Sequence, residues 1–145
     1  MRGISIEIKL TTNWSISSDV NADDSNSFFL FISVLIVIPA ALVYGFQPNL
    51  LFDVNLDTID EANILKAIMG LYLSFAVLWS LGILNPSLWK VATVSNIIFM
   101  LGIAFGRIIS LFCDGFPSGV FVIGTLGEMI LGFYGCYILQ REKEM

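Results

Sequence analysis

Arg107 and Glu128 are charged residues that lie inside long apolar stretches of the chain. A charge at membrane depth is costly and marks a functional position by default. A turn expected at residues 114–118 makes the two stretches antiparallel neighbours. The helical rise puts Arg107 roughly 7–10 Å below that turn and Glu128 roughly 12–16 Å below it. Because the arginine side chain is long, we expect the two charged groups to meet.

The expected pair has two interpretations. It can be a clasp that fixes helix register, because breaking a buried ion pair costs about 3–5 kcal/mol. It can also belong to a site for a ligand, an ion or a proton. Other polar residues at the same level favour a site, although Lys66 can instead extend to the membrane interface. The candidate ligand-binding or buried polar cluster is Asn63, Lys66, Arg107, Ser110, Asp114 and Glu128.

The composition narrows the chemistry of such a site. The chain has no histidine, which removes the commonest metal ligand, the usual haem ligand and the favourite general base. Cys113 and Cys136 are expected more than about 20 Å apart, too far for a disulfide within one chain. We therefore predict no metal and no cofactor. An enzyme is the least favoured function, since only a carboxylate such as Glu128 could act as acid or base.

Four apolar stretches must position these residues. The composition is 57% hydrophobic and 13% charged, with a mean hydropathy of +0.85, whereas soluble domains are nearer a quarter charged. A membrane-spanning helix needs roughly 20 apolar residues. The sequence therefore predicts an all-α, polytopic membrane four-helix bundle over residues 28–145, with the lipid bilayer as its surroundings. The stretches are residues 28–46, 64–84, 91–112 and 120–139.

Residues 1–27 form a short polar N-terminal segment. Ile4, Ile6, Ile8 and Leu10 alternate with polar residues, which is strand periodicity. Residues 13–27 are rich in Ser, Asn and Asp and are typical of a linker. Two interpretations stay open: a flexible tail, or a strand that adds to the sheet edge of a partner.

Local signals predict where the helices begin, end and pack. Thr58 and Glu61 fit a capping box, so the second helix should begin near Ile59. Short turns are expected at residues 85–87 and 114–118, with Gly115 suited to a left-handed cap. Glycines four residues apart predict close helix packing. These helix-packing positions are Gly102, Gly106, Gly124 and Gly132.

Positive residues predict the orientation, because they concentrate on the cytoplasmic side of membrane proteins. Arg2, Lys9, Lys90, Arg141 and Lys143 fall on one side. Both termini should therefore be cytoplasmic, in a multi-pass protein of a bacterial inner membrane. The chain has a net charge of −5 and no basic cluster, so nucleic acid is not an expected partner.

The motif around the arginine resembles a known family. It reads Gly106-Arg107-x-x-Ser110-Leu111-x-x-Asp114-Gly115-x-Pro117-Ser118, followed by Glu128 and Gly132. The chain resembles small bacterial four-helix membrane proteins catalogued as domain of unknown function 4345 over about residues 28–139, and most specifically over residues 106–132. The resemblance implies a fold and a polar motif, but no activity. Lys66 stands where the family pattern favours arginine, which keeps the charge but loses the planar fork that recognises carboxylate or phosphate.

Two functions follow as hypotheses. The first is a small accessory or structural subunit of a membrane complex, which the glycine grooves and the small size favour. The second is a binding or transport module for a small anionic or amphipathic ligand, such as a lipid-like molecule, held in the outer half of the bundle. A pocket around Arg107 that reaches the surface would favour binding. A filled bundle with an apolar outer stripe would favour the subunit.

Overall fold

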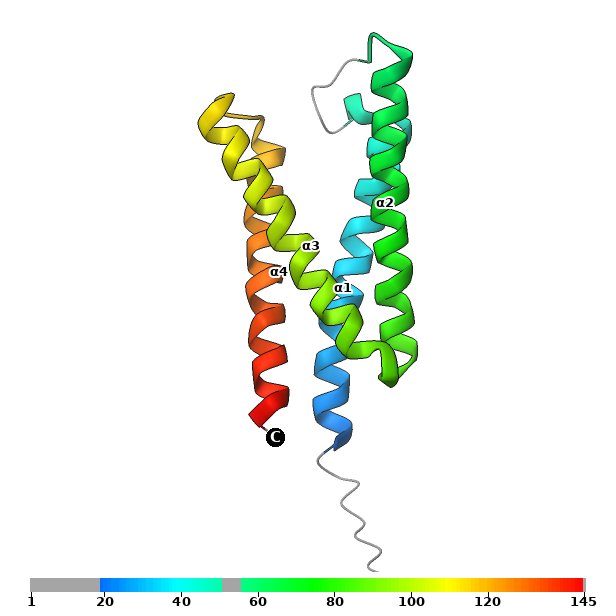
Figure 1. Cartoon of the computed structure of the whole chain (residues 1–145), viewed down its shortest axis with the longest axis vertical. Coiled ribbons are helices and arrows are strands. Elements are labelled where there is room, and N and C mark those ends of the chain that lie inside the picture. Colours follow the sequence, from blue (N-terminus) through cyan, green and yellow to red (C-terminus); the bar gives the residue numbers. More distant parts are fainter. Residues whose placement is uncertain (1–18, 51–55, 145) are drawn as a thin grey trace, which may run out of the picture.

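The computed structural model describes residues 19–50 and 56–144, which form long α-helices joined by short connections (Figure 1). Within these residues the helices are α1 (Asp19–Phe46), α2 (Ile59–Leu84), α3 (Pro86–Cys113) and α4 (Gly119–Glu144), with a short 3₁₀ helix, η1, at Pro48–Leu50. All four long helices contain spans of 20 to 28 residues that are apolar enough to cross a membrane. The predicted all-α, multi-pass four-helix architecture is confirmed.

The start of α2 follows the predicted capping box. The Thr58 hydroxyl oxygen accepts a hydrogen bond from the Glu61 amide at 3.2 Å, and the Thr58 amide donates to Glu61 Oε2 at 2.9 Å. These bonds satisfy amide groups that have no partner inside the helix. At the same end of the bundle, Gly115 has a positive φ of 102° after the last turn of α3, as the left-handed cap requires.

Two helices begin earlier than the apolar stretches predict. α3 begins at Pro86, because proline suits the first helical position and Asn85 caps it by accepting from the Ser87 amide at 3.0 Å. The predicted turn at residues 85–87 is therefore shorter. α1 begins at Asp19, inside the segment predicted as a linker. A helix nucleated by its apolar part extends at little cost, and an acidic residue is favourable at its N-terminus. The strand pattern at residues 4–10 lies outside the described residues.

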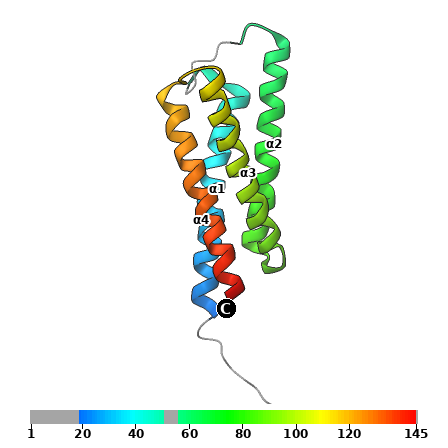
Figure 2. The same ribbon diagram turned by 60° about the vertical axis from the view of Figure 1, so that its left-hand side comes forward.

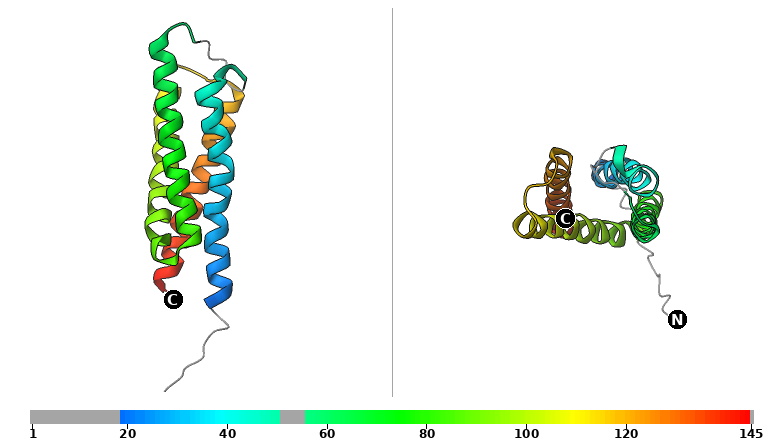
Figure 3. Two further views of the ribbon diagram at one scale, coloured as in Figure 1. Left: turned by 90° about the vertical axis from the view of Figure 1, so that its right-hand side faces the viewer. Right: turned by 90° about the horizontal axis from the view of Figure 1, so that it is seen from above.

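The helices pack in chain order, α1 on α2, α2 on α3 and α3 on α4, while α1 also contacts α3 and α4. Seen from above in Figure 3, α1 and α2 form one pair and α4 stands beside the far part of α3. In Figure 1, α3 runs obliquely across the bundle. The α3–α4 pair therefore diverges from the α1–α2 pair toward the turn at Asp114. We call this the Asp114 end of the bundle.

Close packing holds the opposite end together, where α1 begins and α4 ends (Figure 2). A Cβ at Gly135 of α4 would lie 2.7 Å from Ile97 of α3 and 2.9 Å from Phe29 of α1. Only glycine allows this approach of three helices. In mid-bundle, Phe99 packs against Trp79 with ring centroids 5.3 Å apart. The core is therefore dense away from the Asp114 end, and the helices separate toward it.

Candidate functional site

Arg107 of α3 and Glu128 of α4 form an ion pair inside the apolar part of the bundle. Arg107 Nη1 lies 3.1 Å from Glu128 Oε1, and the two side chains are 21% and 15% exposed. The helical rise predicts this meeting, because the two helices are antiparallel and joined by a short turn. The two charges compensate each other, so neither is left alone inside the membrane-spanning helices.

The guanidinium of Arg107, which belongs to α3, contacts residues of two other helices, α1 and α4. Its Nη2 donates to the Tyr44 hydroxyl of α1 at 3.3 Å, and its carbon Cζ lies 5.4 Å from the centre of the Phe121 ring of α4. A cation over an aromatic face is attracted by the ring quadrupole. A Cβ at Gly124 would lie 2.7 Å from Nη1. The missing side chain at Gly124 therefore leaves space for the guanidinium. Through its contacts the guanidinium connects α3 and α4 to α1.

A cavity of ≈ 420 Å³ lies beside the ion pair, with lining residues from all four helices. Among the described residues that line it, the polar side chains are Tyr44, Tyr72, Arg107 and Glu128, and the others are apolar or glycine. Tyr72 packs edge-on against Tyr44, with ring centroids 5.7 Å apart. Ligand sites are commonly cavities of about 300–1,000 Å³ with an apolar lining and a few polar groups. This cavity has that character.

The cavity opens between α1 and α4. Ile36 on the α1 side is 52% exposed, and Val120 and Ile123 on the α4 side are 43% and 72% exposed. In a chain that spans a membrane, apolar side chains exposed at this depth face lipid hydrocarbon. The mouth of the cavity therefore faces lipid, while its two charged lining residues, Arg107 and Glu128, lie on α3 and α4.

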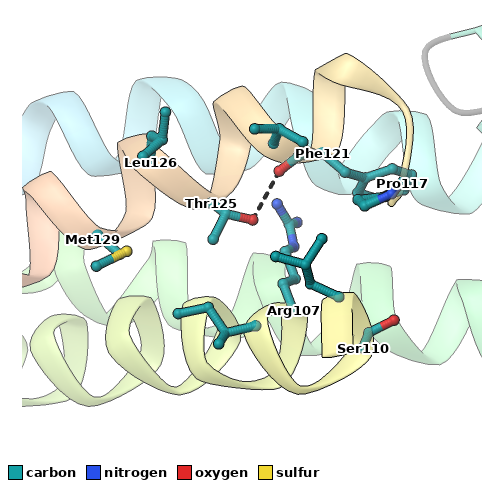
Figure 4. Close-up of a pocket in the computed structure, with 10 residues that line it drawn as sticks. Arg107, Ser110, Pro117, Phe121, Thr125, Leu126 and Met129 are labelled. Carbon is teal, nitrogen blue, oxygen red and sulfur yellow. Dashed lines mark hydrogen bonds between the residues drawn. The ribbon is translucent and has the colours of Figure 1, made fainter. Parts of the chain in front are cut away.

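A second cavity of ≈ 390 Å³ lies between α3 and α4 on the other side of the arginine. Figure 4 shows the Arg107 side chain rising from α3 toward Phe121 and Thr125 of α4, with Leu126 and Met129 farther along the wall. The Thr125 hydroxyl donates to the Phe121 carbonyl at 2.8 Å, so it is already satisfied by its own helix. Arg107 thus lines both cavities and lies between them.

The structure does not bring all six residues of the predicted cluster together. Asn63 and Lys66 are exposed on α2, and among the described residues α2 makes no contact with α4. Asp114, at the Asp114 end of the bundle, is also exposed and accepts a hydrogen bond from the Ser110 hydroxyl at 2.8 Å. Equal height along the membrane does not place residues on the same side of their helices. Ser110 lines the second cavity with Arg107.

The predicted packing glycines divide into two groups. Gly124 and Gly132 are closely packed. Arg107 packs against Gly124, and a Cβ at Gly132 would lie 2.5 Å from a methyl carbon of Leu101. Gly102 and Gly106 are exposed, and a Cβ at either would meet nothing within 4 Å of the described chain. The close approach predicted at these two positions is therefore not made inside the bundle, because α4 packs on another face of α3.

Comparison with known proteins gives one result. Residues 26–139 match the family described as Domain of unknown function (DUF4345). The chain belongs to this family. The resemblance predicted from the motif around Arg107 is thus confirmed. The matched range contains Tyr44, Arg107 and Glu128, so the whole site lies within the DUF4345 domain. No curated protein and no solved structure matches the chain.

Two tyrosines of the DUF4345 domain complete the site but are missing from the predicted cluster. Tyr44 is near the end of α1, where an aromatic residue is typical of a membrane interface. Tyr72 lies inside α2 and is buried. The position of Tyr44 along its helix is a signal that sequence reasoning can use. Tyr44 lies two residues before the end of α1, about 3 Å of helical rise, and so falls in the same half of the bundle as Arg107. Which way these rings point depends on helix packing.

Proposed function

We propose that this DUF4345 protein binds an amphipathic molecule in the cavity between α1 and α4. The observation that carries the proposal is the cavity of ≈ 420 Å³, whose apolar wall holds the Arg107–Glu128 pair. An apolar body fits the lining, and a polar end fits the charged pair. Because the mouth faces lipid, such a molecule can enter from the membrane without crossing water.

The position of the polar groups supports a binding role over a simple clasp. A clasp needs only the two charged side chains, which a closed α3–α4 interface would hold. Here the guanidinium also contacts Tyr44 of the separate α1–α2 pair. The helices diverge around this contact and leave a lined cavity beside it. Burial of polar groups at the wall of a cavity is typical of ligand sites.

A substitution that fills the cavity with a side chain tests the proposal. Gly127 lines the cavity, and a Cβ built on it meets nothing within 4 Å. Because the Cβ position is open, Gly127→Leu should place its side chain in the cavity and abolish ligand binding. Gly102→Leu is the matched control, because Gly102 also has open space but lies outside this cavity. Native mass spectrometry after extraction in a gentle detergent should show a small molecule on the wild type and on Gly102→Leu only. Equal amounts on both variants would contradict the proposal.

A second candidate function is a small accessory subunit of a membrane complex. Its support is the exposed Gly102–Gly106 surface of α3, where a helix of another protein can approach closely. The same two variants separate the candidates. A subunit role predicts that Gly102→Leu loses a co-purifying protein, while Gly127→Leu keeps it. If both variants keep the partner, the Gly102–Gly106 surface is not where the partner binds.

A further inference from the structure

The two oxygens of the Glu128 carboxylate have different surroundings. Oε1 faces Arg107 Nη1 at 3.1 Å. Oε2 is buried and, among the described residues, has no hydrogen-bond partner. A buried carboxylate oxygen without a donor is costly, because it has lost water and gained nothing in return. Glu128 lines the cavity between α1 and α4, and a small rotation of its carboxylate would turn Oε2 toward a molecule in that cavity, which is the natural source of a donor.

Arg107 offers little attraction to an anion in the same cavity. Its charge is balanced by Glu128, and its Nη2 already donates to Tyr44 at 3.3 Å. An anionic ligand on the remaining N–H groups of the guanidinium would stand beside the Glu128 carboxylate, which would repel it at close range. In surroundings of low dielectric constant this repulsion is strong. A cationic ligand would in turn be repelled by the Arg107 guanidinium.

We infer that the polar end of the ligand is an uncharged hydroxyl, which donates to Glu128 Oε2 while its apolar chain lies between α1 and α4. The occupant is thus a lipid alcohol, and a fatty acid or a phosphate ester is disfavoured. One donor suffices, because one carboxylate oxygen lacks a partner. The inference rests on the proposed function, since it describes the ligand of the same cavity.

The test uses dodecanol that carries a photoreactive diazirine on its chain, added to the full-length protein in phosphatidylcholine nanodiscs. Crosslinks should map to the cavity walls at residues 36–44 and 120–131. Three unlabelled competitors share the chain: dodecanol, its methyl ether and dodecanoate. The ether keeps the oxygen but lacks the donor. Dodecanol should compete at least about tenfold better than either of the others, the factor that one hydrogen bond to a charged group confers.

Glu128→Gln gives a second readout that a merely structural role would not produce. Without the carboxylate, Arg107 is an uncompensated cation, so dodecanoate should become the strongest competitor. Wild-type protein that prefers dodecanoate or the ether would overturn the inference, and so would Glu128→Gln protein that still prefers dodecanol. If this variant folds poorly, the wild-type ranking decides alone. Crosslinking that is unchanged in Gly127→Leu would instead refute the cavity as the binding site, and with it the proposed function.

Discussion

Gly124 and Gly127 of α4 provide a matched pair of substitutions that measures how firmly Arg107 is held. A Cβ at Gly124 would lie 2.7 Å from Arg107 Nη1, whereas a Cβ at Gly127 would meet nothing within 4 Å. Both positions lie in the same helix, so each alanine gains about 1 kcal/mol of helix propensity over glycine. The difference between the two variants therefore isolates the displacement of the guanidinium.

The expected magnitude follows from what the displaced group contacts. Nη1 must move away from the new methyl group, and this movement breaks its 3.1 Å contact with Glu128. A hydrogen bond to a charged group contributes about 1.5–3 kcal/mol. Gly127→Ala should therefore stabilise the protein by about 1 kcal/mol. Gly124→Ala should destabilise it by about 0.5–2 kcal/mol, which is the lost contact less the propensity gain.

The assay is unfolding of the purified protein in mixed micelles, followed by the change in helical signal as denaturing detergent is added. A Glu128→Gln background supplies the control, because the contact that Gly124→Ala breaks is then already weakened. In that background the two alanine variants should differ less, since contacting residues are not additive. Equal stabilisation by Gly124→Ala and Gly127→Ala in the wild-type background would refute the reasoning. The guanidinium would then move freely, and Glu128 would not hold it.

Three further predictions concern the pair, the topology and the N-terminal segment. Arg107→Ala and Glu128→Ala should each destabilise the bundle, and the double variant should cost less than their sum by about 0.5–3 kcal/mol in thermal unfolding; strict additivity would separate the two residues energetically. With native cysteines replaced, a cysteine at Asp57 should react with an impermeant reagent in intact cells and one at Glu142 should not; the reverse pattern would overturn the orientation. Deletion of residues 1–27 should leave membrane insertion and thermal stability nearly unchanged, and a large stability loss in the purified monomer would show that the segment packs on the bundle.

The sequence by itself determined the elements and their heights in the membrane. Apolar length predicted four spanning helices, and local hydrogen-bonding chemistry predicted the cap at Thr58 and the left-handed Gly115. The rise of an α-helix also predicted that Arg107 and Glu128 meet across a short turn. These inferences succeed because they depend on neighbours along the chain, whose spacing the helix geometry sets.

Only the tertiary structure decided which residues at one height share a site. Lys66 lies in the same half of the bundle as Arg107 but is exposed on α2, whereas Tyr44 of α1 reaches the guanidinium. That choice depends on how far each helix is rotated about its axis and on the oblique path of α3. Packing of side chains between helices sets both quantities. The same packing, tight at Gly135 and open at the Asp114 end, creates the cavity, which no pattern along the chain encodes.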